Sequence, residues 1–247
     1  MNDTTAEPFS LDVAVKTDKG TGCAHNEDHC GSVVLSTRSA LLVVADGNST
    51  TEGGELASER AVTTVIRSFG ETPHQLQQIE RLVRAVRNAN YEIREMALTV
   101  PQLGGMSATL TAVSVSDGLM SAAHVGNGRV YLIRDGEMVQ LSKDHTVAAE
   151  AGRPDEGGGT LTRQLGTELI IPIDLFEIHL LQHDVVVICT DGLHRVLSEE
   201  EIVATATTGD AATVCRRLIE RANHVGAPDN VSVGVVGVVG PARKDLE

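Results

Sequence analysis

Aromatic side chains and positive charge are both scarce in this chain of 247 residues. It contains no tryptophan, and phenylalanine, tyrosine and tryptophan together make up 2% of the sequence. Acidic residues number 34 against 20 lysines and arginines, which gives a formal net charge of −14. Nucleic-acid binders present a basic face, and single-strand binders add aromatic platforms for base stacking. We therefore expect no nucleic-acid partner and no electrostatic docking on an anionic membrane.

Long apolar runs and paired cysteines are missing as well. No apolar stretch is long enough to span a bilayer, and the first residues lack the basic and apolar regions of a signal peptide. The four cysteines are Cys23, Cys30, Cys189 and Cys215, and none forms a Cys-x-x-Cys pair. This spacing argues against structural zinc and against a disulfide framework. We expect a soluble cytoplasmic protein with reduced, non-catalytic thiols.

Hydrophobic periodicity predicts an alternation of strands and helices. The predicted strands are 11–15, 33–35, 41–45, 106–113, 119–125, 129–133, 138–141, 175–180, 185–189 and 231–239. The predicted helices are 55–69, 73–98, 198–207 and 211–223. Helix starts are indicated by Thr72 followed by Pro73, by a capping box of Ser198 and Glu201, and by Asp210.

The order of these elements is strands, two helices, strands, two helices and a last strand, which fits a sandwich with helical layers outside antiparallel sheets. Residues 126–128 (Gly-Asn-Gly) predict a hairpin turn inside an antiparallel meander over 104–141. We expect one domain over residues 9–240, with flexible tails at 1–8 and 241–247, and a mobile loop over 152–159. Asp144 and His145 are adjacent, either as a catalytic pair or, as is more common, in a structural role.

Three aspartates stand beside predicted buried strands. Asp46 ends the run 41–45 and precedes Gly47, Asp191 follows 184–190, and Asp229 precedes the strand 231–239. An Asp-Gly pair after a strand is commonly only a turn. If the three strand ends meet, however, their carboxylates repel one another unless cations lie between them. Such oxygen ligands suit Mg²⁺ or Mn²⁺, so we hypothesise a metal site.

With these motifs in hand, the chain resembles the metal-dependent protein phosphatases, the type 2C Ser/Thr phosphatases, from about residue 11 to residue 239. The resemblance rests on an ordered series of short motifs, each weak by itself. They are residues 17–20, 26–28, 44–47, 105–109, 123–126, 131–136, 143–145, 161–166, 189–193 and 229–230. The resemblance implies an α+β fold, a four-layer αββα sandwich of two antiparallel sheets flanked by helix pairs, with a two-metal centre at one edge.

The resemblance also implies roles for individual residues. Asp46 would bridge two Mn²⁺ or Mg²⁺ ions, with the Gly47 carbonyl completing one of them, while Asp191 and Asp229 hold the other. Glu27 and Asp28 correspond to the acids that orient metal-bound water, and Asn230 belongs to the same surrounding group. Asp28 is thereby counted with Asp46, Asp191 and Asp229 among the catalytic residues.

The implied activity is hydrolysis of phosphoserine and phosphothreonine esters in proteins by water activated between two metal ions. The partner would be a phosphoprotein, and the enzyme would oppose a Ser/Thr kinase. Two other classes stay open: a pseudophosphatase that binds phosphoprotein without turnover, and a purely structural scaffold. Metal-dependent hydrolysis of an aryl phosphate and of a phosphothreonine peptide would separate them.

Three positions depart from the family pattern. Cys23 stands where the family usually has an arginine that clamps the substrate phosphate, and a thiol cannot replace that charged fork. Asn127 replaces an aspartate that helps to hold a third metal, so a third ion should bind poorly. Asn48 replaces a methionine or histidine after the first Asp-Gly pair and cannot act as a general acid. The segment between His145 and Leu161 is also short for the family's flap.

Overall fold

The computed structural model describes residues 9–48, 53–73, 75–153 and 159–240. Two predictions fall largely on residues outside these ranges. The flexible tails, 1–8 and 241–247, lie outside them, as do residues 154–158 of the expected mobile loop.

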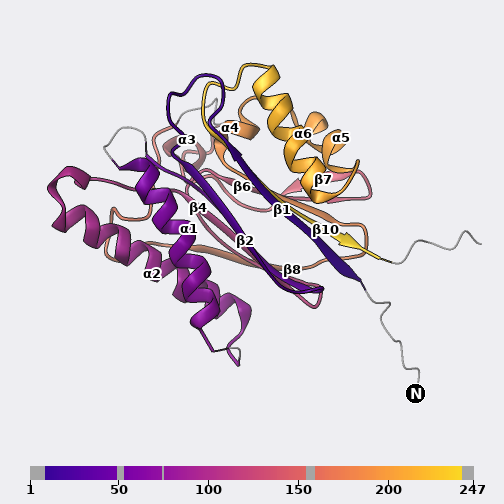
Figure 1. Cartoon of the computed structure of the whole chain (residues 1–247), viewed down its shortest axis with the longest axis horizontal. Coiled ribbons are helices and arrows are strands. Elements are labelled where there is room, and N and C mark those ends of the chain that lie inside the picture. The colour runs from indigo at the N-terminus through magenta and orange to yellow at the C-terminus, as the bar shows by residue number, and fades with distance from the viewer. Residues whose placement is uncertain (1–8, 49–52, 74, 154–158, 241–247) are drawn as a thin grey trace, which may run out of the picture.

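Two five-stranded antiparallel sheets form the centre of the molecule (Figure 1). Sheet A has the order β1 (Ser10–Asp18), β10 (Val231–Val239), β9 (Val185–Cys189), β6 (Arg129–Arg134) and β7 (Glu137–Gln140). Sheet B has the order β2 (Asp28–Ser36), β3 (Ser39–Asp46), β4 (Leu110–Ser116), β5 (Leu119–Val125) and β8 (Asp174–His179). Strands from both ends of the chain are therefore neighbours: β1 pairs with β10 along its whole length.

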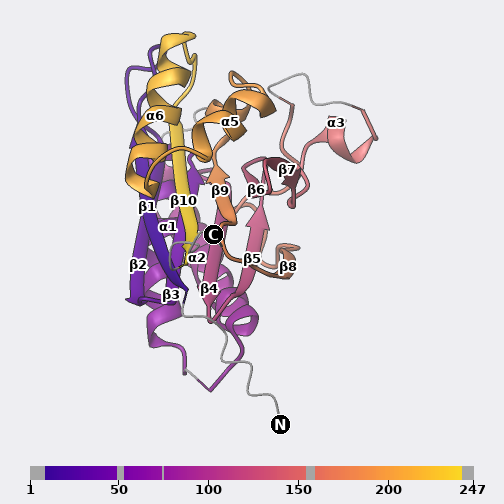
Figure 2. The same ribbon diagram turned by 90° about the vertical axis from the view of Figure 1, so that its right-hand side faces the viewer.

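Helices cover the outer face of each sheet. The helices α1 (Gly54–Glu71) and α2 (Gln78–Thr99) pack on sheet B, and α5 (Glu199–Ala206) and α6 (Ala211–His224) pack on sheet A. Three short helices lie in connections: η1 (Pro101–Leu103), α3 (Val147–Glu150) and α4 (Asp191–His194). In Figure 2, α3 and the chain around it project to one side of the sandwich. This arrangement confirms the expected α+β sandwich with helix pairs outside two antiparallel sheets.

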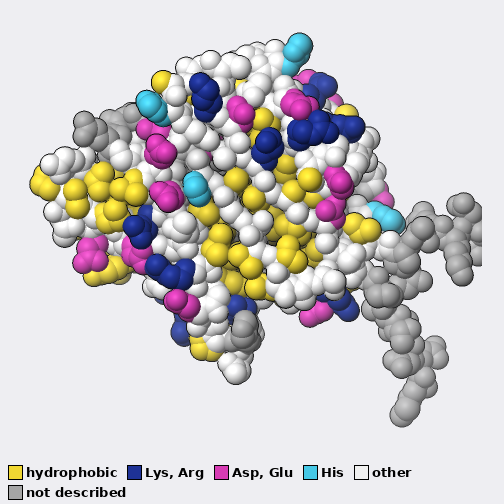
Figure 3. Space-filling model, in the orientation of Figure 1, with side chains coloured by type: hydrophobic (Ala, Val, Ile, Leu, Met, Phe, Trp, Pro, Cys, Tyr) yellow, Lys and Arg dark blue, Asp and Glu magenta, His cyan; other side chains and the backbone are white. Residues whose placement is uncertain are grey.

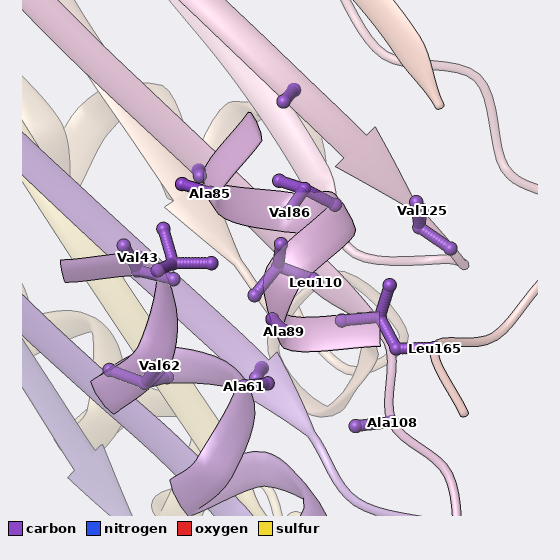
Figure 4. Packing of buried hydrophobic residues seen from close by; sticks show 14 of the residues in the cluster. Val43, Ala61, Val62, Ala85, Val86, Ala89, Ala108, Leu110, Val125 and Leu165 are labelled. Carbon is purple, nitrogen blue, oxygen red and sulfur yellow. The ribbon is translucent and has the colours of Figure 1, made fainter. Parts of the chain in front are cut away.

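The alternation of side chains along β3 explains how the layers hold together. Leu41 and Val43 point to the core shared with α1 and α2, whereas Leu42 and Val44 point to the core between the two sheets. A strand that is buried on both faces needs an apolar residue at every position, and this is why residues 41–45 form an unbroken apolar run. Figure 4 shows the first of these cores, where Val43 and Leu110 of sheet B meet Val62, Ala85 and Val86 of the helices.

The predicted hairpin at residues 126–128 is wrong, because the strands on either side of it lie in different sheets. β5 pairs with β4 and β8 in sheet B, whereas β6 pairs with β7 and β9 in sheet A. Gly126 has φ +111°, and a Cβ there would lie 2.5 Å from Cβ of Thr109. The two glycines thus serve a tight crossover between sheets, which a period-two pattern cannot distinguish from a hairpin.

The second long helix begins later than predicted. Thr72 is not its N-cap: its backbone N–H and its hydroxyl both donate to the Ser68 carbonyl, so this residue ends α1. A turn follows, in which the Leu76 N–H donates to the Pro73 carbonyl, and Gln77 is the N-cap of α2. The capping box of Ser198 with Glu201 is confirmed for α5.

β4 also begins later than predicted, at Leu110 rather than at residue 106. Ala108, just before it, makes isolated bridges to Gly47 on one side and to Leu165 on the other. The extended segment before β4 therefore ties the end of β3 to the segment around residue 165 instead of continuing the sheet.

Hydrophobic side chains lie across the middle of the face seen in Figure 3, over the strands, while lysines and arginines lie mainly over the helices on either side. No helix in the described ranges combines the length and hydropathy needed to cross a bilayer.

Leu42 gives a test of the core between the sheets. It is 1% exposed, so Leu42→Ala should remove buried contacts and leave a cavity, at a cost of about 2–5 kcal/mol of unfolding free energy. Thermal unfolding should show a Tm lower by roughly 5–15 °C. The matched control is Leu181→Ala, at a side chain that is 55% exposed, which should shift Tm little. Equal shifts in the two variants would contradict the assigned core.

Candidate metal centre

The aspartates that follow or precede the central strands meet at one end of the sandwich, near α4 in Figure 1. Asp46 ends β3, Asp191 begins α4 directly after β9, and Asp229 precedes β10. They line a cavity of about 390 Å³. The other lining residues of this cavity are Glu27, Gly47, Asn48, Thr109, Asn127, 159–161, Gln164 and Asn230.

The acids of the centre come from strands of both sheets or from residues beside them. Asp28 and Asp46 are directly opposite each other on β2 and β3 of sheet B, while Asp191 and Asp229 adjoin strands of sheet A. Thr190 joins the two halves, since its hydroxyl donates to Asp28 Oδ2 at 2.7 Å and accepts from the Ser232 N–H at 2.9 Å. Thr190 is not among the site residues predicted from the sequence. Its only signal was its place immediately before the Asp191-Gly192 pair.

Burial and mutual repulsion perturb the acids. Burial, followed by the charges of Asp28, Asp191 and Asp229, raises the pKa of Asp46 well above its ordinary value. Burial also raises the pKa of Asp28 to about 7, although the hydrogen bond from Thr190 opposes the shift. The pKa of Asp191 is raised by burial and then by Asp229. Arg195 opposes the shift at Asp191, but burial and the acidic neighbours outweigh it.

Asn230 organises the loop that carries the remaining acids. Its Oδ1 accepts from the Glu27 N–H at 2.8 Å, and its Nδ2 donates to the carbonyls of Lys19 and His25, both at 2.9 Å. Glu27 Oε2 is buried without a hydrogen-bond partner among the described residues. Burial and then Asp229 raise the pKa of Glu27. The asparagine after Asp229 thus holds Glu27 beside the cavity.

Asp191 has two polar partners that the sequence analysis did not assign to it. Its Oδ2 accepts from Asn127 Nδ2 at 2.9 Å and from Arg195 Nη1 at 3.1 Å. Arg195 Nη1 also lies 3.8 Å from Asp229 Oδ2. Arg195 stands four residues after Asp191, the spacing at which helical side chains pair, and that spacing was the available signal.

The glycines that follow Asp46 and Asp191 are needed for close approach. A Cβ on Gly47 would lie 2.1 Å from the Gly54 carbonyl oxygen, and one on Gly192 would lie 1.9 Å from the Asn230 carbonyl oxygen. Neither contact is possible for a real side chain, and both neighbours are backbone atoms. Each Asp-Gly pair is therefore a packing requirement of the centre and not a hairpin turn.

The other residues noted in the sequence lie around the centre or outside it. Asn48 faces Gln164, with Nδ2 at 3.0 Å from Oε1. Asp144 forms a two-pronged ion pair with Arg129, and His145 Nε2 lies 3.2 Å from Asp174 Oδ2. Asp144 and His145 line a different cavity from the acids, so the structure favours their structural role.

The thiols are unlike nucleophiles. All four cysteines are free. Burial raises the pKa of Cys30, Cys189 and Cys215, and burial together with the Asp229 charge raises that of Cys23. A neutral thiol is neither a good nucleophile nor a ligand for an anion.

The residues fit hard divalent cations by their chemistry. The cavity offers carboxylate oxygens that repel one another, and the buried Glu27 Oε2 and Asn127 Oδ1 have no hydrogen-bond partner in the described ranges. Within those ranges, no group of three or more His, Cys, Asp or Glu side chains forms a ready-made metal site. The guanidinium of Arg195 lies against two of the carboxylates.

Comparisons with known proteins agree with the geometry. The family model described as protein phosphatase 2C matches residues 21–231. The serine/threonine protein phosphatase PstP of Mycobacterium tuberculosis is 33% identical over 240 residues, which cover 93% of this chain and 45% of PstP. The chain thus spans about half the length of that relative. The serine/threonine phosphatase stp of Listeria innocua is 32% identical, with 90% of this chain and 93% of the relative covered.

Solved structures share the fold. The catalytic domain of PstP in complex with two manganese ions has a TM-score of 0.83 at 32% identity and covers 94% of this chain and 100% of its own. A structure of the Mycobacterium tuberculosis PstP/Ppp phosphatase has a TM-score of 0.82 at 30% identity, covering 93% of this chain and 99% of its own.

His124 fixes the crossover that carries Asn127, and it makes this region sensitive to acid. Its Nε2 faces the carbonyls of Gly126 and Lys143 at 3.0 and 3.1 Å, and its Nδ1 lies 3.0 Å from Thr111 Oγ1. Burial, and then the neighbouring His145, lowers its pKa to about 4. The imidazole is therefore neutral in the folded protein at pH 7.

The pH dependence follows from the sign of this shift. Because the pKa of His124 is lower in the folded than in the unfolded chain, its contribution is complete above pH 6.5 and is lost as the pH falls toward 4, by up to about 3 kcal/mol. In His124→Gln, the unfolding free energy measured by urea denaturation should fall less steeply over this pH range than in the parent. The difference in slope should correspond to one fewer proton taken up on unfolding. The control is His179→Gln, at an exposed position. Parallel pH curves for His124→Gln and the parent would contradict a buried neutral His124.

Proposed function

The chain belongs to the protein phosphatase 2C family, and from this membership we propose that it is a metal-dependent Ser/Thr phosphoprotein phosphatase. The observation that carries the proposal is the convergence of Asp46, Asp191 and Asp229 from both sheets on one cavity, with Asp28 directly opposite Asp46 on β2. Burial, and then the charges of neighbouring acids, raise the pKa values of Asp28, Asp46 and Asp191, and bound cations would offset both effects.

We assign the metal ligands residue by residue. Asp46 would bridge two Mn²⁺ or Mg²⁺ ions, the Gly47 carbonyl would complete one of them, and Asp191 and Asp229 would hold the other. Support comes from the position of all four at the cavity and from the two manganese ions bound by the catalytic domain of PstP. A third ion should bind weakly, because the Asn127 amide is uncharged and its Nδ2 already donates to Asp191.

Two divalent ions, when bound, supply a nucleophilic water at neutral pH and neutralise the oxygens of the transferred phosphoryl group. The protein's own part is to hold the acids in place. Thr190 keeps Asp28 against the centre, and Asn230 fixes the loop before Glu27. Glu27 Oε2, buried and unpartnered in the described structure, is placed to accept a hydrogen bond from an ordered water at the cavity wall.

The relatives suggest the class of substrate. PstP and stp are serine/threonine phosphatases, so we propose that this chain removes phosphate from phosphoserine and phosphothreonine in proteins and opposes a Ser/Thr kinase. Its four free thiols favour a reducing compartment, and we propose the cytoplasm as its location.

A second candidate function is a pseudophosphatase that binds phosphoprotein without hydrolysing it. Cys23 favours it, because the neutral thiol replaces a charged phosphate-binding arginine. Hydrolysis of p-nitrophenyl phosphate and of a phosphothreonine peptide, with Mn²⁺ and with a chelator, separates the two. Metal-dependent turnover supports the phosphatase. Phosphopeptide binding without turnover, in protein shown to hold Mn²⁺, supports the pseudophosphatase.

Metal binding is tested directly through stability. Saturating Mn²⁺ should raise the Tm of the parent by roughly 5–10 °C, since a ligand that binds only the folded state stabilises it. Asp191→Asn should lose most of this shift, and any metal-dependent turnover, because a neutral amide replaces a charged ligand.

The matched control is Asp117→Asn, whose side chain is 73% exposed and pairs only with Arg38 in the described structure. It should keep the Mn²⁺ shift and the turnover. A parent whose Tm does not respond to millimolar Mn²⁺ would refute the metal centre.

Cys23 tests the thiol assignment. Cys23→Ser keeps a small neutral side chain and should leave the Mn²⁺ shift and metal-dependent turnover within about twofold of the parent, because the raised thiol pKa leaves little thiolate to act. Steady-state kinetics with p-nitrophenyl phosphate measure this. Loss of turnover in a folded, Mn²⁺-binding Cys23→Ser protein would show that the thiol takes part in catalysis.

A further inference from the structure

The guanidinium of Arg195 lies beside the proposed metal centre. Arg195 directly follows α4, and its Nη1 lies 3.1 Å from Asp191 Oδ2 and 3.8 Å from Asp229 Oδ2. Its side chain is 30% exposed and that of Asp229 is 46% exposed, so the pair borders solvent on one side and the buried acids on the other. Both contacts use one nitrogen of the fork, and a guanidinium has donors on three nitrogens.

Position 23 lies near the other oxygen of the same carboxylate. Cys23 Sγ lies 3.9 Å from Asp229 Oδ1 and 3.5 Å from the Pro228 carbonyl oxygen. A side chain at position 23 and the guanidinium of Arg195 therefore flank the two oxygens of Asp229. A thiol carries no positive charge, so that side offers none to an anion.

The cavity itself repels phosphate. Its described lining contains Glu27, Asp46, Asp191 and Asp229 but no lysine or arginine. Lys19 is a further cation in this region. Its Nζ lies 3.5 Å from the Cys23 carbonyl oxygen, so its contact is with the backbone. A phosphate monoester is a dianion whose oxygens match the planar fork of an arginine, and Arg195 brings that fork to two of the proposed metal ligands.

We propose that Arg195 binds the phosphoryl group of the substrate and supplies from α4 the charge that position 23 lacks. This inference rests on the proposed phosphatase function, and it adds a substrate-binding residue to that site. Asp191 and Asp229, which line the cavity, hold the guanidinium beside it. If Asp191 and Asp229 held metal ions, the fork of Arg195 would remain available for the oxygens of a phosphoryl group bound there.

The test measures phosphate binding apart from turnover. The Mn²⁺-loaded protein is titrated with inorganic phosphate by isothermal calorimetry and by thermal shift, for the parent, Arg195→Gln, Arg195→Lys and Lys19→Gln. The matched control is Arg216→Gln on α6, where an exposed arginine pairs with Glu220. The Mn²⁺ affinity of each variant is measured first, so that phosphate affinities are compared at equal metal saturation.

Arg195→Gln should weaken phosphate binding by about 10- to 100-fold, the loss expected for charged hydrogen bonds, and should raise KM for p-nitrophenyl phosphate. Arg195→Lys should fall between the parent and Arg195→Gln, since it keeps the charge but not the fork. Lys19→Gln and Arg216→Gln should bind phosphate as the parent does. The Mn²⁺ affinity of Arg195→Gln should be unchanged or higher, because a cation has been removed beside the ligands.

A double-mutant cycle completes the test. Cys23→Arg should restore phosphate affinity in the Arg195→Gln background and should improve it much less in the parent, because both guanidiniums would serve one phosphoryl group. Unchanged phosphate affinity in an Mn²⁺-loaded Arg195→Gln protein overturns the role of Arg195 and leaves the phosphatase proposal standing. Loss of phosphate binding in Lys19→Gln alone overturns it equally. A parent that binds no Mn²⁺ instead refutes the metal centre on which both proposals rest.

Discussion

The crowding of negative charge at one end of the sandwich is the constraint on which the site depends. Asp28, Asp46 and Asp191 all have raised pKa values because burial and their acidic neighbours disfavour the ionised forms. A chain selected for stability alone would not gather these groups, since an unpaired buried carboxylate is costly. The surrounding hydrogen bonds hold the arrangement. Thr190 holds Asp28, Asn230 holds the loop before Glu27, and Asn127 and Arg195 hold Asp191.

The packing of the two sheets fixes the relative positions of the acids. Two acids come from sheet B and two from beside sheet A, so their distances depend on how the sheets pack. That packing is set by the apolar core between the sheets, where Leu42 and Val44 of β3 face Val186 and Ile188 of β9. β3 and β9 both run directly into the centre, which means that the residues fixing the layer spacing lie on the same strands as the acids. A rigid scaffold of this kind keeps ligands in place when no metal offsets their repulsion.

Much of this could be predicted from the sequence. The apolar runs gave the strands, the helical periodicity gave both long helices, and the three aspartates beside strands indicated the centre. The predictions that failed depended on information that hydrophobic periodicity does not carry. Nothing local shows that the chain changes sheets at residues 126–128, because Gly-Asn-Gly suits a hairpin and a crossover alike. Thr72 looked like the start of α2, but its hydrogen bonds to Ser68 close α1. The partners of Asp191 depend on tertiary contacts, with the i,i+4 spacing of Arg195 as the one local sign.

Two of the expected departures from the family pattern, at positions 23 and 127, both affect the charge around the proposed metal centre. Against the family pattern expected from the resemblance, Cys23 would remove a positive charge and Asn127 would avoid a negative one, so the two differences act in opposite senses. The guanidinium of Arg195 lies against both Asp191 and Asp229, so the centre still contains a cation that belongs to the protein. Arg195 directly follows α4, which packs against β9 and β10. Among the residues discussed at this centre, the positive charge therefore comes from the residue that follows α4 and not from the loop around residue 23.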